Sequence, residues 1–205
     1  MINSLILATG NPHKLAEIQS LFGDSLSVFS LKDLDCHEAL PEEHDTLEGN
    51  ALQKALWVFQ RFQKPCLADD TGLEVFALEG RPGVFSARYA GEENPAKQSE
   101  ANVGKLLRDM KDIRNRQARF RTVLAYVDAA GETFLFEGIV EGEIAEAPRG
   151  EKGFGYDPVF IPRGFQQTFA EMPFEMKNSL SHRGQAIAAF VKGLQFLSEP
   201  GHRDI

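Results

Sequence analysis

Residues 4–23, SLILATGNPHKLAEIQSLFG, constrain the fold more than any other segment of the chain. The apolar run Leu5–Ala8 predicts a buried strand that ends in a glycine turn. A helix then follows, because Asn11 is a favoured N-cap residue, Pro12 suits the first helical position and Gly23 is a stop signal. Strand, tight turn and helix in this order are the usual opening of an α/β fold.

The rest of the chain alternates between strand-like and helix-like segments. Apolar residues at helical spacing predict a long helix over 46–63, and two strand-like runs joined by Ala129-Ala130-Gly131 predict an antiparallel hairpin. We therefore predict an α/β fold with a mixed twisted sheet and flanking helices, in two lobes around a central substrate cleft, formed by residues 1–205 as a single domain. The other predicted elements are strands at 26–31, 66–68, 73–78, 118–128 and 132–146, and helices at 94–110 and 182–197.

Composition argues against several classes of protein. The 205 residues carry a formal net charge of −8, whereas a general nucleic-acid-binding protein is usually basic. No apolar run reaches the roughly 18 residues of a membrane-spanning helix, and we expect no signal peptide. The two cysteines, Cys36 and Cys66, do not suggest a disulfide framework. We expect a cytoplasmic enzyme that binds neither nucleic acid nor membrane.

Basic residues stand at the beginnings of two predicted helices, where the helix dipole disfavours them by roughly 0.3–1 kcal/mol each. These residues are His13 and Lys14 in the first helix and His182 and Arg183 in the last, with Lys177 just upstream. A helix N-terminus with a nearby lysine is a ready anion site, and phosphate is a common occupant. Two such sites in an acidic protein favour a ligand that carries phosphates.

Two pairs of adjacent acids suit a metal ion. Asp69 and Asp70 follow the apolar run 66–68 at a predicted strand end, and Glu42 and Glu43 lie in an acidic loop. Mg²⁺ is usually held by one or two carboxylates together with substrate phosphates, so it allows both kinds of anion to share a site. The acids therefore predict a magnesium site, in which either Glu42 or Glu43 is the second ligand. No Cys/His cluster has zinc spacing.

The segment GFGYDP, residues 153–158, combines aromatic residues with glycines. Phe154 and Tyr156 offer flat faces on which a base stacks, and Asp157 with the loop backbone can bind the edge of the base. Cations for phosphate, acids for a metal and an aromatic platform together predict a nucleoside triphosphate site.

Five segments resemble, in order and spacing, the inosine triphosphate pyrophosphatase family of noncanonical purine nucleotide pyrophosphatases. They run from the first strand to the last helix: LATGNPHK, GNALQKA, ADDTGLEVFALEGRPGVFSARYAG, KGFGYDPVF and KNSLSHRGQA. The resemblance implies Mg²⁺-dependent hydrolysis of ITP, dITP and XTP between the α- and β-phosphates, which yields the monophosphate and pyrophosphate. It also implies an elongated α/β fold with a central cleft and a homodimer.

The same resemblance implies roles for the residues of each motif. Asp70 is the expected proton acceptor and a metal ligand, and Glu42 is the second metal-binding acid. Lys14 and Lys54 are the expected catalytic cations. The chain departs from the family at Gly49, where many members have an acid. The expected substrate-binding residues are Thr9, Gly10, Asn11, Pro12, His13, Lys14, Thr71, Phe154, Gly155, Tyr156, Asp157, Lys177, His182 and Arg183.

Two other functions are compatible with these residues. One is a related pyrophosphatase for modified pyrimidine nucleotides, which predicts little hydrolysis of ITP. The other is a nucleotide sensor or protein-interaction module without turnover, although a pure binder gains little from carboxylates placed beside phosphates. In the purine enzyme, base selection is expected from hydrogen bonds to the 6-oxo edge that a 6-amino group does not reproduce.

Overall fold

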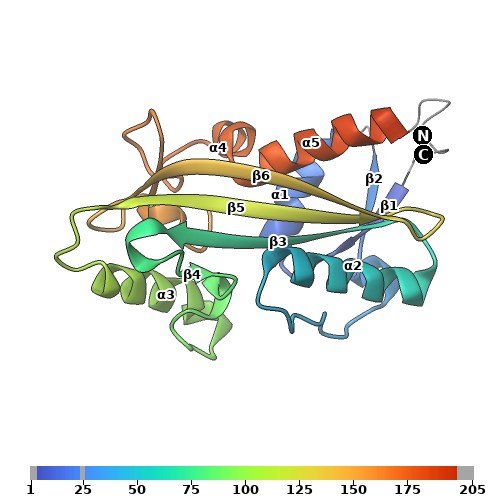
Figure 1. Cartoon of the computed structure of the whole chain (residues 1–205), viewed down its shortest axis with the longest axis horizontal. Helices are drawn as coiled ribbons and strands as arrows, with labels where there is room; N and C mark the ends of the chain where they lie inside the picture. The colour runs from blue at the N-terminus through green and yellow to red at the C-terminus, as the bar shows by residue number, and fades with distance from the viewer. Residues whose placement is uncertain (1–3, 24–25, 198–205) are drawn as a thin grey trace. The chain divides into compact units, whose positions relative to one another are not determined.

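The computed structural model describes residues 4–23 and 26–197 and confirms the predicted α/β class with a mixed sheet (Figure 1). The strand order is β2-β1-β3-β5-β6-β7, and β4 pairs with β3. The strands are β1 (Ser4–Ala8), β2 (Ser27–Ser30), β3 (Cys66–Val75), β4 (Pro82–Gly83), β5 (Gln117–Val127), β6 (Thr133–Ile144) and β7 (Phe160–Pro162). The α-helices are α1 (Pro12–Phe22), α2 (Leu47–Phe62), α3 (Pro95–Asp109), α4 (Phe174–Leu180) and α5 (His182–Leu197). No described helix is long and apolar enough to cross a membrane.

The chain divides into two compact units. Unit 1 comprises Met1–Asp70, Thr122–Gly138 and Arg183–Ile205, and unit 2 comprises Thr71–Arg121 and Ile139–His182. Strands β3, β5 and β6 each contribute residues to both units. The single domain that the sequence indicates stays a prediction.

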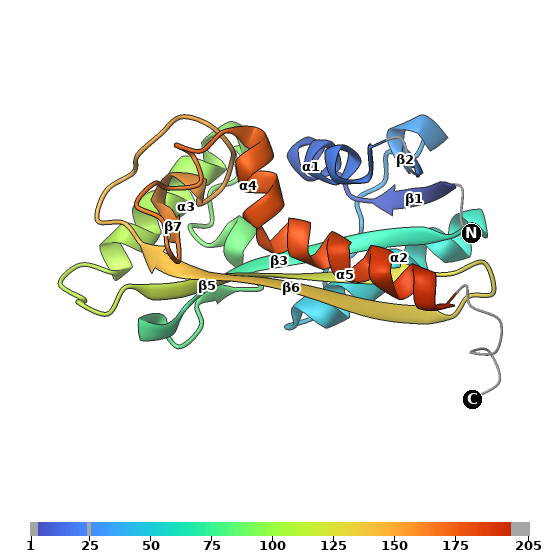
Figure 2. The same cartoon turned by 90° about the horizontal axis from the view of Figure 1, so that it is seen from above.

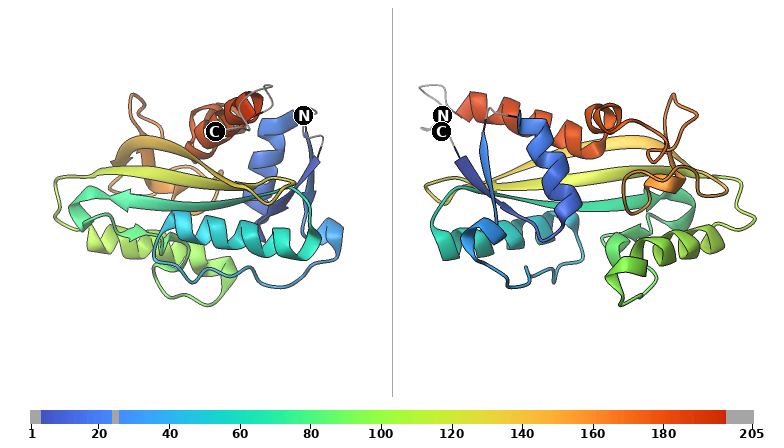
Figure 3. Two further views of the ribbon diagram at one scale, coloured as in Figure 1. Left: turned by 45° about the vertical axis from the view of Figure 1, so that its right-hand side comes forward. Right: turned by 180° about the vertical axis from the view of Figure 1, so that it is seen from behind.

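Unit 1 contains the predicted strand–turn–helix opening. β1 pairs in parallel with β2 and with β3, and Asn11 caps α1 as expected. Figures 1 and 2 show α2 on one side of β3 and α5 on the other, and Figure 3 shows α1 beside β1 and β2. The core of this unit joins apolar side chains from β1, α1, β3, β5 and α5; they include Leu5, Leu7, Ile18, Phe22, Leu67, Leu124 and Phe190.

β3 is one continuous strand, so the predicted strand end before the two aspartates and the predicted second strand over 73–78 are wrong. Gly72 gives the reason. A Cβ at this position would lie 2.6 Å from the carbonyl oxygen of Gly83 next to it in β4, so the glycine permits close approach of two backbones and does not mark a turn. After Val75, residues Phe76–Leu78 form a 3₁₀ helix.

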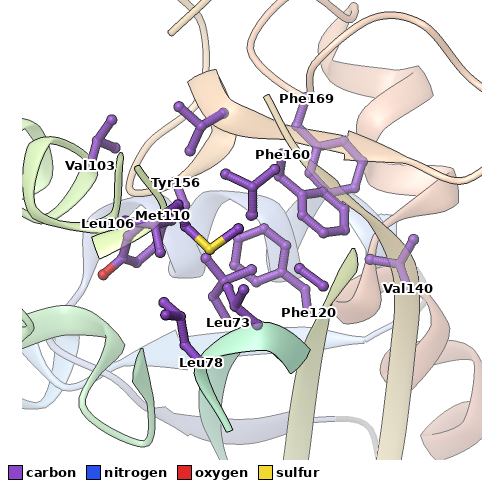
Figure 4. Packing of buried hydrophobic residues seen from close by; sticks show 14 of the residues in the cluster. Leu73, Leu78, Val103, Leu106, Met110, Phe120, Val140, Tyr156, Phe160 and Phe169 are labelled. Carbon is purple, nitrogen blue, oxygen red and sulfur yellow. The ribbon is translucent and has the colours of Figure 1, made fainter. Parts of the chain in front are cut away.

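Unit 2 has its own apolar core, which Figure 4 shows from close by. Rings of Phe120, Phe160 and Phe169 pack against one another, with centres 4.7 Å apart for Phe120 and Phe160. α3 contributes Val103 and Leu106 to this core. The short helix α4 was not predicted, because its seven residues, FEMKNSL, have no clear apolar periodicity.

Candidate active site

Asp69 and Asp70 are neighbours in β3, and both side chains are buried. Successive side chains of a strand point to opposite sides of the sheet, so the two carboxylates point in opposite directions. The parallel register pairs Ala8 of β1 with Ala68 of β3. The turn after β1 therefore begins beside Asp69, and this brings residues 9–14 to the acids.

Asp69 lies between two cations of unit 1. Its Oδ2 is 2.9 Å from Nζ of Lys14 and 3.3 Å from Nη2 of Arg183. Arg183 is 1% exposed, and its Nη1 also forms an ion pair with Glu17 of α1. Burial alone would raise the pKa of Asp69, but Lys14 and Arg183 lower it well below its ordinary value. Asp69 is therefore a fixed negative charge that holds both cations in place.

Asp70 points toward α2 on the other side of β3. Its Oδ1 is 2.9 Å from Nζ of the buried Lys54, and its Oδ2 accepts a 3.5 Å hydrogen bond from Nδ2 of Asn50. Burial raises the pKa of Asp70 although Lys54 acts in the opposite direction. For Lys54, burial is outweighed by attraction to Asp70, Asp69 and Glu42, so the pKa of the ammonium is raised. Asp70 thus accepts a proton more readily than Asp69 does.

The acidic loop turns its two glutamates in different directions. Oε1 of Glu42 accepts a 2.7 Å hydrogen bond from Nζ of Lys54, the nitrogen that also binds Asp70. Glu43 pairs instead with Gln53: its N–H donates to Oε1 at 3.0 Å, and its Oε2 accepts from Nε2 at 2.9 Å. Of the two candidates for second metal ligand, Glu42 is the one that shares a partner with Asp70.

Gly49 allows this loop to pack tightly against α2. A Cβ at position 49 would lie 2.6 Å from Cβ of His44. The side chain of His44 therefore occupies the space that an acid at position 49 would need.

Asp70 and Glu42 form an oxygen-only donor set that fits Mg²⁺. In the described part of the chain, no group of three or more His, Cys, Asp or Glu side chains is arranged to hold a metal ion. Two carboxylates are nevertheless sufficient for Mg²⁺, which commonly takes its remaining ligands from water and substrate phosphates. The residues therefore suit an ion that is completed by a nucleotide.

Residues Thr9–Lys14 form the turn after β1 and the first residues of α1. Oδ1 of Asn11 accepts hydrogen bonds from the N–H groups of His13 at 2.9 Å and Lys14 at 3.3 Å. Oγ1 of Thr9 accepts a hydrogen bond from the N–H of Asn11 at 3.2 Å. These bonds fix the turn and direct Lys14 to Asp69. The exposed residues of the turn are Gly10, Pro12 and His13.

In unit 2, Asp157 organises the loop 153–157. Its Oδ2 accepts hydrogen bonds from the N–H of Phe154 at 2.8 Å and from Nζ of Lys177 at 2.5 Å. Gly153 has φ 75°, and a Cβ there would lie 2.0 Å from Oδ2 of Asp157, so the loop requires glycine. Nζ of Lys177 also lies 5.0 Å from the ring centre of Phe154, which is a cation–π distance.

Tyr156 is not the exposed stacking surface that the sequence indicates. Its ring is buried in the core of unit 2 (Figure 4), and its hydroxyl donates a 2.9 Å hydrogen bond to the carbonyl oxygen of Ser86. Ser86 is held in turn, because its Oγ accepts the N–H of Leu73 and its carbonyl accepts Nδ2 of Asn102. Tyr156 therefore anchors the loop from inside, and Phe154 is the half-buried aromatic residue of the loop.

The other expected substrate-binding residues of unit 2 are Thr71, Gly155 and His182. Thr71 follows Asp70 in β3 and is half-buried, as is Gly155. His182 is buried, and its ring stacks on Phe120 with centres 4.6 Å apart and planes 20° from parallel. An apolar neighbour therefore fixes the plane of the imidazole.

Two buried polar residues of unit 1, Glu17 and Asn50, are not among the site residues that the sequence predicts. Glu17 stands three positions after Lys14 in α1, and Asn50 stands four positions before Lys54 in α2. Helical spacing places each on the same side of its helix as the lysine. A polar residue at this spacing from an expected phosphate-binding lysine is the signal that would have identified both.

A model of the Ham1 family matches residues 5–193, which is most of the chain. The chain belongs to the Ham1 family. This match confirms the family resemblance based on five motifs. Solved Ham1 structures share the fold: the Staphylococcus aureus Ham1 protein has a TM-score of 0.84 and 37% identity, over 95% of this chain and 100% of that one. A nucleoside-triphosphatase, dITP/XTP pyrophosphatase, from Mycobacterium abscessus has a TM-score of 0.73 and 40% identity, over 92% and 98%.

Several bacterial relatives of this Ham1 chain carry the name dITP/XTP pyrophosphatase. The protein from Porphyromonas gingivalis is 52% identical over 188 residues, which cover 91% of this chain and 95% of that protein. The protein from Flavobacterium johnsoniae is 48% identical over 187 residues, with the same coverage of 91% and 95%.

Proposed function

We propose that this Ham1 chain hydrolyses noncanonical purine nucleoside triphosphates, namely ITP, dITP and XTP, to the monophosphate and pyrophosphate. The observation that carries the proposal is the charged cluster of unit 1, in which Lys14 and Lys54 contact Asp69 and Asp70 from opposite sides of one strand. A cluster of two buried carboxylates and two lysines suits phosphate chemistry, in which positioning and charge stabilisation do most of the work. Relatives named dITP/XTP pyrophosphatase support the choice of substrate.

In the proposed reaction, Asp70 orients a water molecule for attack on the α-phosphorus and accepts its proton. The raised pKa of Asp70 favours this role, because a more basic carboxylate is the better proton acceptor. Lys14 and Lys54 direct positive charge to the phosphate oxygens and stabilise the departing pyrophosphate. Asp69, which stays charged, keeps Lys14 at the end of β1.

Asp70 and Glu42 are the residues that would hold Mg²⁺. When bound, the ion supplies positive charge to the phosphate oxygens and lowers the pKa of a coordinated water. Lys54 contacts both carboxylates and therefore keeps them on one side of β3 when no ion is present.

We assign the purine base to the loop 153–157 of unit 2, with Phe154 as the stacking surface. Lys177 is a hydrogen-bond donor with no acceptor capacity, so it suits the 6-oxo group of hypoxanthine or xanthine and not the 6-amino group of adenine. An N–H of Lys177 that faces a 6-amino group finds no acceptor there, and one such missing hydrogen bond costs about 1–3 kcal/mol, which is roughly a tenfold to hundredfold preference for ITP over ATP. Asp157 orients this donor.

Cytoplasmic location and a homodimer also belong to this proposal. Both come from the family resemblance and the composition of the chain. Size-exclusion chromatography with light scattering would measure the mass in solution and test the dimer.

A substrate panel tests the proposed function. Inorganic pyrophosphate and orthophosphate would be measured separately with ITP, dITP, XTP, GTP, ATP and a modified pyrimidine triphosphate, with Mg²⁺ and with excess chelator. We expect pyrophosphate from ITP, dITP and XTP, and none after chelation. Faster turnover of the pyrimidine would favour the related pyrophosphatase, and ITP binding without any product would favour a sensor.

A further inference from the structure

Asn50 of α2 contacts both Asp70 and the loop that carries Glu42. Its Nδ2 donates to Oδ2 of Asp70 at 3.5 Å, and its Oδ1 accepts the N–H of His44 at 2.9 Å. The residue is 1% exposed, so its amide is shielded from water. We propose that Asn50 is a positioning residue, which sets the orientation of the Asp70 carboxylate and holds Glu42 beside it; this inference rests on the proposed function.

The two oxygens of Asp70 have different partners, and this fixes the plane of the carboxylate. Lys54 binds Oδ1 at 2.9 Å, while Asn50 binds Oδ2. A single donor would leave the group free to rotate about the bond between Cβ and Cγ. The bond from Asn50 is long at 3.5 Å, so it is weaker than the 2.9 Å bond from Lys54. With both oxygens bound, the buried carboxylate of Asp70 faces the attacking water in one orientation.

The carbonyl end of the same amide restrains the acidic loop. His44 stands two positions after Glu42, and its N–H is bound to Oδ1 of Asn50. Glu42 reaches Lys54 from this loop, so its position depends on where the loop is fixed. One side chain therefore links the two carboxylates that are proposed to hold the metal. No other amino acid of this size has both a donor and an acceptor in this planar arrangement.

Gln53 provides a matched control in the same helix. It forms two hydrogen bonds, of 2.9 and 3.0 Å, with Glu43, which is next to Glu42 in the same loop. It therefore restrains the loop as Asn50 does, but its amide is bonded to Glu43 and not to Asp70. If loop restraint alone mattered, loss of either amide would have a similar effect on turnover.

The test compares Asn50→Asp, Asn50→Ala and Gln53→Ala with the unmodified chain. Asn50→Asp keeps an acceptor for the N–H of His44 and replaces the donor to Asp70 with a repelling carboxylate. Asn50→Ala removes both bonds. For each variant, kcat and KM for ITP, the melting temperature, and hydrogen exchange at the amides of residues 42–45 would be measured. Exchange is followed without nucleotide or metal, so it reports the tether independently of activity.

We expect Asn50→Asp to lower kcat at least about tenfold with little change in KM, because the buried amide of Asn50 is bonded to Asp70 and to the N–H of His44. Exchange at His44 should stay slow in Asn50→Asp and become faster in Asn50→Ala. Gln53→Ala should speed exchange at Glu43 and leave kcat within about twofold.

Three results would overturn the proposal. One is a kcat for Asn50→Asp or Asn50→Ala within about twofold of the unmodified chain. The second is an equal loss of kcat in Gln53→Ala, which would make loop restraint the whole effect. The third is slow exchange at His44 in Asn50→Ala. This would show that Asn50 does not restrain the loop, even if the chain proved to have no pyrophosphatase activity. If Asn50→Asp does not fold, the comparison of Asn50→Ala with Gln53→Ala gives the decision.

Discussion

Asp69 and Asp70 are adjacent in β3, yet their carboxylates have different partners on opposite sides of the strand. Asp69 is held by Lys14 and Arg183, and its pKa is lowered; Asp70 contacts Lys54, and its pKa is raised. Two acids whose environments move their pKa values apart are suited to different tasks. We infer that Asp69 is a fixed charge and that Asp70 is the group that accepts a proton.

The first prediction concerns Asp70→Asn. The change keeps the shape of the side chain and removes the proton acceptor, so kcat for ITP should fall by about 10²–10⁴-fold. The melting temperature should change little, because a buried carboxylate with a raised pKa is replaced by a neutral group while Lys54 keeps its ion pair with Glu42. Steady-state pyrophosphate release and thermal unfolding would be measured on the same preparation. Near-normal turnover at saturating Mg²⁺ would show that Asp70 does not have this role.

Asp69→Asn should affect stability instead. The change leaves the buried guanidinium of Arg183 without one of its carboxylates, and loss of one partner of a buried ion pair costs about 3–5 kcal/mol. Urea unfolding at neutral pH should show a decrease of this size in the free energy of unfolding. A decrease of less than about 1 kcal/mol, the usual value for an exposed pair, would contradict the fixed-charge role.

The stability contributed by Asp69 should also depend on pH. Its pKa is lower in the folded chain than in the unfolded chain, so the contribution is complete above the unfolded value near 3.8 and is lost as pH falls below it. The difference in unfolding free energy between the natural chain and Asp69→Asn should therefore shrink as the pH is lowered from about 4 to about 2. A constant difference over this range would show that the pKa of Asp69 is not lowered by folding.

Substitutions of the adjacent residues Glu42 and Glu43 give a matched test and control for the metal site. Glu42→Gln should raise the Mg²⁺ concentration needed for half-maximal turnover by about tenfold or more, because one of two expected carboxylate ligands is lost. Glu43→Gln should have little effect, since the side chain of Glu43 is bonded to Gln53. Magnesium titrations of both variants at saturating ITP make the comparison. An equal rise in the required Mg²⁺ concentration in the two variants would show that Glu42 is not the second metal ligand.

Several parts of this arrangement could be predicted from the sequence, and their physical basis is local. The Asn11 cap, the helix over 46–63 and the hairpin of β5 and β6 depend on spacing and turn residues within one segment. The pairing of Lys54 with Asp70 could not be predicted from the residues alone, because it depends on how α2 packs against β3. Likewise, Lys14 reaches Asp69 only because β1 and β3 pair in parallel.

The error at β3 has a similar cause. Asp-Asp-Thr-Gly has the composition of a turn, and no local signal shows that Gly72 is needed for approach to β4. Tyr156 is likewise predicted to offer a flat face for a base, because it lies on a glycine-rich loop. Its burial depends on Ser86, which is 70 positions away in the sequence and accepts its hydrogen bond.

Phe154 and Tyr156 should respond differently to substitution. Phe154→Ala removes the proposed stacking surface, so KM for ITP should rise by roughly tenfold, as expected when about 1–3 kcal/mol of stacking is lost. Tyr156→Phe removes the hydroxyl that is bonded to Ser86, so the free energy of unfolding should fall by about 1 kcal/mol with KM nearly unchanged. Kinetics with ITP and urea unfolding separate the two effects. A larger rise in KM from Tyr156→Phe than from Phe154→Ala would contradict the assignment of Phe154 as the stacking surface and Tyr156 as the internal anchor.

The position of bond cleavage tests the central claim most directly. ITP would be hydrolysed in water enriched in ¹⁸O, and the inosine monophosphate and pyrophosphate would be analysed by mass spectrometry. Attack on the α-phosphorus by a water that Asp70 activates predicts one ¹⁸O atom in the monophosphate and none in the pyrophosphate. Label in the pyrophosphate, or orthophosphate as the product, would contradict this account.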